Sequence, residues 1–144
     1  MADVTIGHGS TVSFKIGAAA AALLGQVTAI GLPNPQIADV EATHFQSPDR
    51  AREYIPGLKD NGEITIGINY DAGSATDTVV NDAMAETAPI EVTISIPTVS
   101  GTNQEFTFPG IVKGYEKAIP IDDRQTATIT IRVAGAVTQA AAGA

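Results

Sequence analysis

Alternation of apolar and polar residues is the clearest pattern in the first half of the chain. In the segment 62–70 every second residue is apolar and bulky, as expected for a strand that buries one face. The segment 11–17 alternates in the same way. The segments 26–33 and 36–43 read as two more strands, which a Pro-Asn-Pro turn connects. We therefore predict four strands before residue 71.

A change of period predicts one helix in the segment 74–89. Ser74 and Asp77 have the spacing of a helix N-cap with an acidic residue in the first turn, and Pro89 ends the helix. Four apolar residues at helical spacing predict its buried face: Val79, Val80, Ala83 and Met84.

Alternation returns after the helix. We expect strands at 90–98, at 105–117 with a break or bulge at Pro109-Gly110, and at 126–133. Short strands at this spacing are typical of β-sandwiches and barrels. The pattern predicts a mainly β domain at 11–135: a sandwich or barrel of about seven strands with one flanking helix.

Three segments show neither period. Residues 43–61 form a long loop that contains six charged residues. Loops of this length are uncommon in compact domains and are usually functional or disordered. We expect residues 1–10 to be an N-terminal arm and residues 136–144 to be a flexible C-terminal tail.

The charge balance argues against a protein that binds nucleic acid. The chain has 16 acidic and 8 basic residues, which gives a net charge of −8 at pH 7, whereas phosphate contacts need basic patches. It contains no cysteine, which excludes disulfides and thiolate chemistry. The uncharged stretch from Ile16 to Ala38 is interrupted by glycine and proline, so we expect no signal peptide and no membrane-spanning helix.

No group of residues predicts catalysis, a cofactor site or a metal site. His8 and His44 have no partners at metal-ligand spacing. Ser10 does not lie in a G-x-S-x-G motif, and no glycine-rich loop has the spacing of a phosphate-binding loop. Asp122-Asp123 reads as a polar turn between strands. We expect neither an enzyme nor a cofactor.

The order of the charged loop and its flanking strands carries a family resemblance. A strand ends in "DVEATHF", the loop contains "REYIPGLKDNGEI", and a strand, a helix and further strands follow up to "IPIDDRQTATITIRVAG". This order resembles the tail tube (major tail) proteins of long-tailed bacteriophages. The matching positions are Thr43, Arg52, Glu53, Gly57, Leu58, Lys59, Asp60 and Gly62, with the stretch from Ile119 to Gly135.

The resemblance implies a structural protein of the virion tail, with no enzymatic activity. Hexameric rings of the chain would stack into a tube that conducts DNA to the host. The implied partners are other copies of the chain and the tape-measure, tail-tip and tail-terminator proteins, with no membrane partner. The loop would make the contacts between rings or subunits through Arg52, Glu53, Tyr54, Ile55, Gly57, Leu58, Lys59 and Asp60.

A lumen lined by carboxylates would repel DNA phosphates, so that DNA slides through without specific binding. Glu63, Glu91 and Glu105 lie on the outward faces of predicted strands and are the candidates, although each is also explained as part of a solvated strand face.

Two other interpretations remain open. The same fold serves as the tube of contractile tails, type VI secretion systems and gene-transfer particles. The second interpretation is a free ligand-binding β-sandwich. Such a module would require an exposed aromatic platform, and Phe45 and Tyr54 are the only aromatic residues that we expect in loops.

Overall fold

The computed structural model describes residues 8–98 and 101–141. These residues form a mainly β structure with one α-helix, which confirms the predicted fold class. The elements are β1 (Thr11–Lys15), β2 (Ala22–Leu23), β3 (Val27–Ile30), β4 (Gln36–Glu41), a 3-10 turn (Pro48–Arg50), β5 (Tyr54–Asp60), β6 (Glu63–Asn69), α1 (Ala75–Ala85), β7 (Ile90–Ile96), β8 (Gln104–Ala118), β9 (Thr126–Val133) and β10 (Thr138–Ala141).

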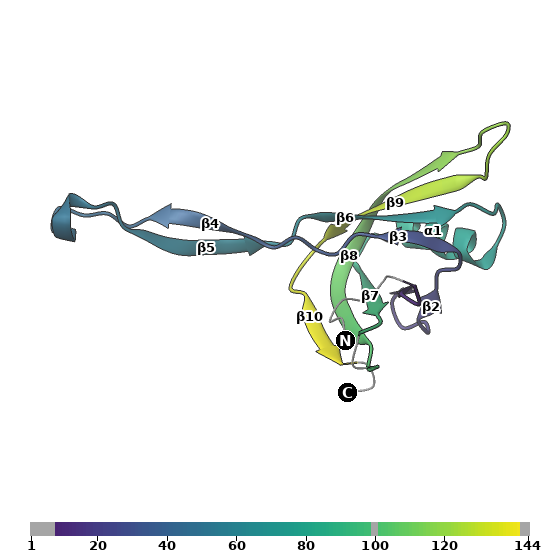
Figure 1. Ribbon diagram of the computed structural model, residues 1–144, viewed down its shortest axis with the longest axis horizontal. Helices are drawn as coiled ribbons and strands as arrows, with labels where there is room; N and C mark the ends of the chain where they lie inside the picture. The colour runs from purple at the N-terminus through teal and green to yellow at the C-terminus, as the bar shows by residue number, and fades with distance from the viewer. Residues whose placement is uncertain (1–7, 99–100, 142–144) are drawn as a thin grey trace, which may run out of the picture.

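Eight strands form one antiparallel sheet in the order β2-β1-β7-β8-β9-β6-β3, with β10 also paired to β8. The long strand β8 connects the two halves of this sheet. Its first half pairs with β7 and β10, and its second half pairs with β9. The sheet is curved (Figure 1).

The core lies on the inner face of this curved sheet. The alternating isoleucines of β6 and β9 meet the apolar residues of β1, β7 and β8 there. The largest fully buried side chains are Phe14, Phe108, Ile66, Ile68, Ile94, Ile129, Ile131, Val12, Val80 and Val92. The outer face of the same strands carries threonine and single charged residues, as the alternation predicts.

Helix α1 begins where the sequence predicts. The Ser74 hydroxyl accepts a hydrogen bond from the Asp77 N–H at 3.2 Å, which is the N-cap. Val80 and Ala83 are buried as expected, whereas Met84 is 41% exposed and lies outside the core. With 11 residues, α1 is too short to cross a bilayer. No helix of the described chain is long and apolar enough to do so.

The segment 43–61 is not the irregular loop that the sequence predicts. Residues 54–60 form β5, which pairs antiparallel with β4 in a separate two-stranded sheet. We call residues 36–60 the extended hairpin, because they project from the body as a narrow ribbon (Figure 1). The Pro-Asn-Pro segment is therefore the connection from the body into this ribbon.

Two further expectations need correction. Residues 138–141 of the expected flexible tail form β10 on β8. The irregularity in β8 lies between Val112 and Gly114, while its pairing with β7 runs through Pro109 and Gly110 without a shift. The expected N-terminal arm falls mostly on residues 1–7, which lie outside the described residues.

Candidate functional site

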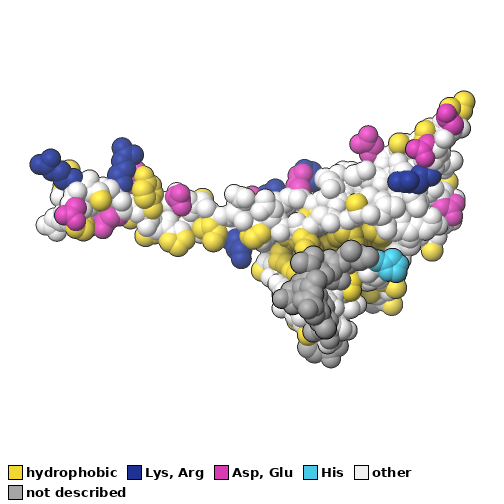
Figure 2. Space-filling model, viewed as in Figure 1, with side chains coloured by type: hydrophobic (Ala, Val, Ile, Leu, Met, Phe, Trp, Pro, Cys, Tyr) yellow, Lys and Arg dark blue, Asp and Glu magenta, His cyan; other side chains and the backbone are white. Residues whose placement is uncertain are grey.

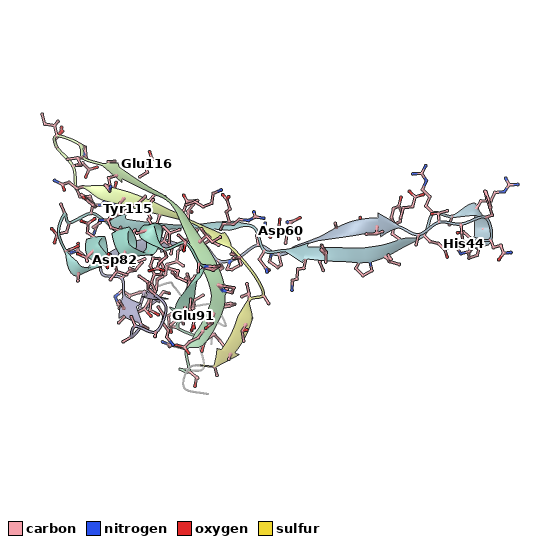
Figure 3. All side chains as sticks on the ribbon, turned by 180° about the vertical axis from the view of Figure 1, so that it is seen from behind. His44, Asp60, Asp82, Glu91, Tyr115 and Glu116 are labelled. Carbon is pink, nitrogen blue, oxygen red and sulfur yellow. The ribbon has the colours of Figure 1, made fainter. Side chains whose placement is uncertain are left out.

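The extended hairpin is the candidate site, because most of the loop residues singled out in the sequence lie on it. Figure 3 shows His44 near its far end and Asp60 where it joins the body. Among the described residues, its two strands pair only with each other. An isolated two-stranded hairpin is at best marginally stable in water. This hairpin therefore depends on additional contacts, both within itself and with the body.

Cross-strand register gives the hairpin two unlike faces. Ile55 lies directly opposite Val40, whereas Tyr54 lies opposite Glu41. Residues opposite each other in an antiparallel pair share a face. The register shifts between Ile37 and Asp39, and a shift of this kind increases the local twist.

Gly57 lies where β5 packs tightly against β4. A Cβ atom built there would be 3.0 Å from both the Ala38 carbonyl oxygen and Val40 Cγ2. A side chain at residue 57 would therefore push β4 and β5 apart. Close approach of the two backbones explains the glycine in "IPGLKD".

Apolar side chains follow the hairpin along its length (Figure 2). Leu58 is 91% exposed and Ile55 is 53% exposed. The other large exposed apolar residues on its strands are Ile37, Val40 and Tyr54. Leu58 also lines a hollow beside the base of the hairpin, together with Ile111 of β8. A concentration of exposed apolar side chains of this kind marks an interaction surface.

Glu53 organises the far end of the hairpin. Its backbone N–H donates to the Thr43 hydroxyl at 2.8 Å, and its backbone carbonyl accepts from the Ala42 N–H at 2.7 Å. Its carboxylate accepts from the Ser47 hydroxyl at 2.7 Å and lies 3.3 Å from His44 Nε2. Thr43 and Glu53 are two of the positions that carry the family resemblance, and the structure brings them together.

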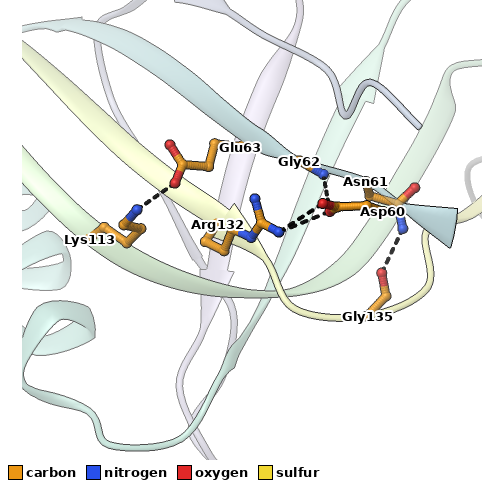
Figure 4. A network of polar contacts seen from close by, with 7 residues as sticks. All are labelled: Asp60, Asn61, Gly62, Glu63, Lys113, Arg132 and Gly135. Atoms are coloured by element: carbon orange, nitrogen blue, oxygen red, sulfur yellow. Dashed lines mark hydrogen bonds and ion pairs between the residues drawn. The ribbon is translucent and has the colours of Figure 1, made fainter. Parts of the chain in front are cut away.

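A polar network fixes the base of the hairpin to the body (Figure 4). The Arg132 guanidinium of β9 donates to both carboxylate oxygens of Asp60, each at 3.0 Å. Asn61, which is only 8% exposed, donates to the Gly135 carbonyl oxygen at 2.8 Å. The Gly62 N–H donates to Asp60 Oδ1 at 2.9 Å. The hairpin thus leaves the sheet in a defined direction.

The network favours the charged forms of its acids. The Gly62 N–H, followed by the Arg132 guanidinium, holds the pKa of Asp60 below its usual value. The neighbouring Glu63 pairs with Lys113 of β8, and this hydrogen bond lowers the pKa of Glu63. Both carboxylates are consequently ionised at neutral pH.

The lumen candidates lie on the outer face of the sheet but are not clustered. Glu63 on β6 is paired with Lys113. Glu91 on β7 lies opposite Lys15 of β1, and Glu105 on β8 lies opposite Ser95. Figure 3 shows Glu91 in the body, away from the hairpin.

Sequence reasoning missed several members of the site. Arg132 is the only charged residue in the strand 126–133. Its position on the polar face of that strand was the one sequence feature that could have indicated a polar contact there. Asn61 and Gly135 are distant in sequence, so their contact was not accessible from the pattern. Arg52 and Lys59, by contrast, are exposed and form no ion pair within the described residues.

The model of the family described as "Lambda phage tail tube protein, TTP" matches residues 11–140. No curated protein matches the sequence.

Solved structures with a similar fold come from several tail-like particles. A subunit from the tail of an empty gene transfer agent particle, refined with C6 symmetry, has a TM-score of 0.74 at 14% identity, covering 95% of this chain and 99% of that one. The SPP1 tail tube gives a TM-score of 0.69 at 16% identity, covering 94% and 78%. The sheath-tube complex of an extracellular contractile injection system gives 0.64 at 13% identity, covering 92% and 88%.

Proposed function

The chain belongs to the lambda phage tail tube protein family, and from that membership we propose that its copies form hexameric rings that stack into the tube of a virion tail. The extended hairpin makes the contact between rings. The tube conducts DNA to the host, and its ends meet tail-tip and terminator proteins, with a tape-measure protein inside. This is a structural role and uses no cofactor.

The observation that carries the proposal is the exposed apolar surface of the extended hairpin. Leu58, Ile55 and Val40 stand in water on a ribbon that the body does not cover. Burying such residues contributes roughly 1.5–3 kcal/mol each relative to leaving them exposed. A second copy of the chain that covered this surface would gain that free energy and stabilise the hairpin as well.

The hexameric ring is supported by analogy. The similar gene transfer agent tail has C6 symmetry. Six copies would place the polar outer faces of six sheets around one axis. In this arrangement Glu91 and Glu105 face the lumen, and Glu63 contributes less negative charge because Lys113 neutralises it.

Electron microscopy of two matched variants tests the proposal. The unaltered chain should form rings or hollow tubes as its concentration rises, with a tail-tip complex added as nucleator. The double variant Ile55→Asp/Leu58→Asp should fold with the same circular dichroism spectrum and form no tubes. The control Leu23→Asp/Met84→Asp places the same charges on exposed apolar residues of the body and should still form them.

Normal tubes from the Ile55/Leu58 variant would remove the hairpin from the inter-ring contact. A monomer at every concentration from the unaltered chain, even with the nucleator, would overturn the tube itself and favour a free binding module.

A contractile machine is the second candidate function, since a tube subunit bound to a sheath has a similar fold. Preassembled tubes mixed with a sheath protein distinguish the two. Co-sedimentation of the sheath would favour the contractile machine, and its absence would favour a tail without a sheath.

A further inference from the structure

An asparagine-glycine dipeptide, Asn61-Gly62, joins the extended hairpin to the body (Figure 4). We call residues 60–62, with Arg132 and Gly135 that contact them, the hairpin base. Asparagine deamidates most readily before glycine, because glycine has no side chain to hinder attack by its own backbone nitrogen. The chain has five asparagines, and Asn61 alone precedes a glycine. The hairpin base therefore contains one intrinsically reactive amide.

Deamidation of this dipeptide needs no reactant other than water. The Gly62 backbone nitrogen attacks the side-chain carbonyl carbon of Asn61, and the new C–N bond closes a succinimide ring. The side-chain nitrogen leaves as ammonia and takes up the proton that the Gly62 nitrogen gives up. Water then opens the ring at either of its carbonyl groups, which gives aspartate or isoaspartate at residue 61. Isoaspartate also adds one carbon to the backbone.

Hydrogen bonds of the hairpin base engage both nitrogen atoms that react. The Gly62 N–H, which would supply the attacking nitrogen, donates to Asp60 Oδ1 at 2.9 Å. The Asn61 side-chain nitrogen, which would leave, donates to the Gly135 carbonyl oxygen at 2.8 Å. Both bonds must break before the Asn61 side chain can meet the Gly62 nitrogen.

The backbone of the dipeptide is held as well. The Asn61 carbonyl oxygen accepts a hydrogen bond from the Asn34 N–H at 3.2 Å, and the Gly62 carbonyl oxygen accepts one from the Val133 N–H at 3.0 Å. Asn61 is only 8% exposed, so water has little access to it. Local opening of a folded protein exposes such groups in a small fraction of molecules. Reaction therefore proceeds from molecules in which the hairpin base is open.

We propose that Asn61 is a deamidation site that the hairpin base protects while closed and that keeps the base open once it has reacted. A carboxylate at residue 61 cannot donate to the Gly135 carbonyl oxygen, and it places a negative charge against that oxygen and next to Asp60. Burying a charge without a partner is unfavourable. The amide does not re-form, so the change runs in one direction.

Mass spectrometry measures the protection directly. Cleavage after Glu53 and Glu63 releases residues 54–63, in which Asn61 is the single asparagine, so one peptide mass reports its deamidation. The synthetic peptide 54–63 gives the rate without protection. At mildly alkaline pH, Asn61 in the folded chain should react at least roughly tenfold slower than in this peptide, which corresponds to an opening free energy of about 1.4 kcal/mol or more.

Arg132→Ala tests whether the hairpin base is the source of the protection. It removes the guanidinium that holds Asp60 and leaves the sequence around Asn61 unchanged. Asn61 should then react roughly tenfold faster than in the unaltered chain. Arg124→Ala makes the same change at an exposed position away from the base and should leave the rate unchanged. The rate at Asn81 of α1 reports whether the body has stayed folded.

Asn61→Asp reproduces one product of the reaction and tests its effect on the base. Amide hydrogen exchange in β5 and at the start of β6 should be roughly tenfold faster than in the unaltered chain. Gln125→Glu makes the same change of amide to acid on an exposed side chain and should leave that exchange unchanged.

One consequence rests on the proposed tube. A subunit with an opened base no longer fixes the direction of its hairpin, so deamidated subunits should collect outside tubes. Sedimentation separates tubes from free subunits, and the deamidated fraction of peptide 54–63 should be higher in the free pool. Equal fractions would remove this effect on assembly.

Two results would overturn the site itself. One is reaction of Asn61 in the folded chain at the rate of the free peptide. The other is an equally slow reaction in Arg132→Ala and in the unaltered chain. If Arg132→Ala also accelerates Asn81, Arg132→Lys replaces it as the milder change, and the same comparison decides. Exchange in Asn61→Asp equal to that of the unaltered chain would overturn the opening of the base. These measurements use free subunits, so their failure leaves the proposed tube in place.

Discussion

Asp60 sets the direction of the extended hairpin, because it is the last residue of β5 and contacts β9 through Arg132. The adjacent Asn61 donates a hydrogen bond to the Gly135 carbonyl oxygen, and the Gly62 N–H donates one to the Asp60 carboxylate. Three consecutive residues thus convert a flexible connection into a fixed one.

We predict that Asp60→Asn loosens the base of the hairpin in a pH-dependent way. The folded-state pKa of Asp60 is lowered, so its charge stabilises the folded state above the unfolded pKa of about 3.9, and this contribution is lost as pH falls through the folded pKa. The variant mimics the protonated acid. Amides in the hairpin base should therefore exchange faster than in the unaltered chain at pH 7, and this difference should shrink as the pH falls below about 3.9, as measured by hydrogen exchange.

Asp82→Asn is the control for this experiment, because Asp82 lies exposed on α1 (Figure 3). Equal exchange rates at pH 7 for Asp60→Asn and the unaltered chain would show that the Arg132 contact does not hold the hairpin.

Gly57→Ala should open the middle of the hairpin. Its Cβ would lie 3.0 Å from a backbone oxygen and a methyl group of β4, and overpacking of this kind costs about 1–3 kcal/mol. Amide exchange in β4 and β5 should accelerate roughly tenfold, with the body unaffected. Gly114→Ala, where the nearest atom is 3.7 Å away, should show little change. Unchanged exchange in β4 and β5 would mean that the strands separate without cost.

At the scale of elements, the sequence predicted those strands that have one buried face. The predicted strand 126–133 coincides with β9, and 62–70 and 90–98 match β6 and β7 within two residues at each end. The helix was found through Ser74, which is its N-cap. Each of these elements packs on the core, and packing on a core is what produces a period in the sequence.

β5 was missed for the same reason. None of its residues is buried, so no alternation marks it, and Pro56-Gly57 reads as a turn. β10 escaped detection because its alanines carry little apolar signal. Of the site itself, the resemblance located the hairpin residues, but the contacts of Glu53 with Ser47 and of Asp60 with Arg132 depend on chain pairing that no local pattern encodes.

The far end of the extended hairpin, residues 42–53, should become more mobile when the Glu53 carboxylate is removed. Glu53→Ala deletes the acceptor for Ser47 and the partner of His44, while its backbone pairing with Thr43 and Ala42 remains. The Ser47 hydrogen bond and the His44 contact together contribute about 1–2 kcal/mol, because both partners of the His44 contact are partly exposed. Trypsin should therefore cut the Arg50–Ala51 bond roughly tenfold faster.

Glu41→Ala removes another exposed acid from the hairpin and should leave that rate unchanged. A rate for Glu53→Ala equal to that of Glu41→Ala would show that the far end is already open in the unaltered chain.

At the scale of the whole molecule, the body and the extended hairpin contribute different things. Every residue of the apolar core lies outside residues 36–60. The body therefore supplies the buried core, and in the proposed tube the hairpin would supply surface for assembly.

Replacing residues 37–59 with Asn-Gly should leave the body folded and abolish tube formation. Gln36 and Asp60 are paired across the base, so a two-residue turn connects them without strain. The free energy of unfolding should change by no more than about 1 kcal/mol, because no core contact is lost and shortening a surface loop has a small entropic effect.

Ile66→Ala in the core is the comparison and should cost about 2–5 kcal/mol. A similar loss from the hairpin replacement, measured by chemical denaturation, would mean that hairpin and body fold as one unit.

A ribbon with two unpaired edges is also a template for uncontrolled strand addition, because each edge offers free N–H and C=O groups. Neither β4 nor β5 has a second partner in the described structure. Pro56 has no N–H to offer, the register shift twists the ribbon, and charged residues flank the apolar ones. These features disfavour fibril formation by strand addition. Free subunits at high concentration would therefore contact one another through side chains and not by pairing backbone edges.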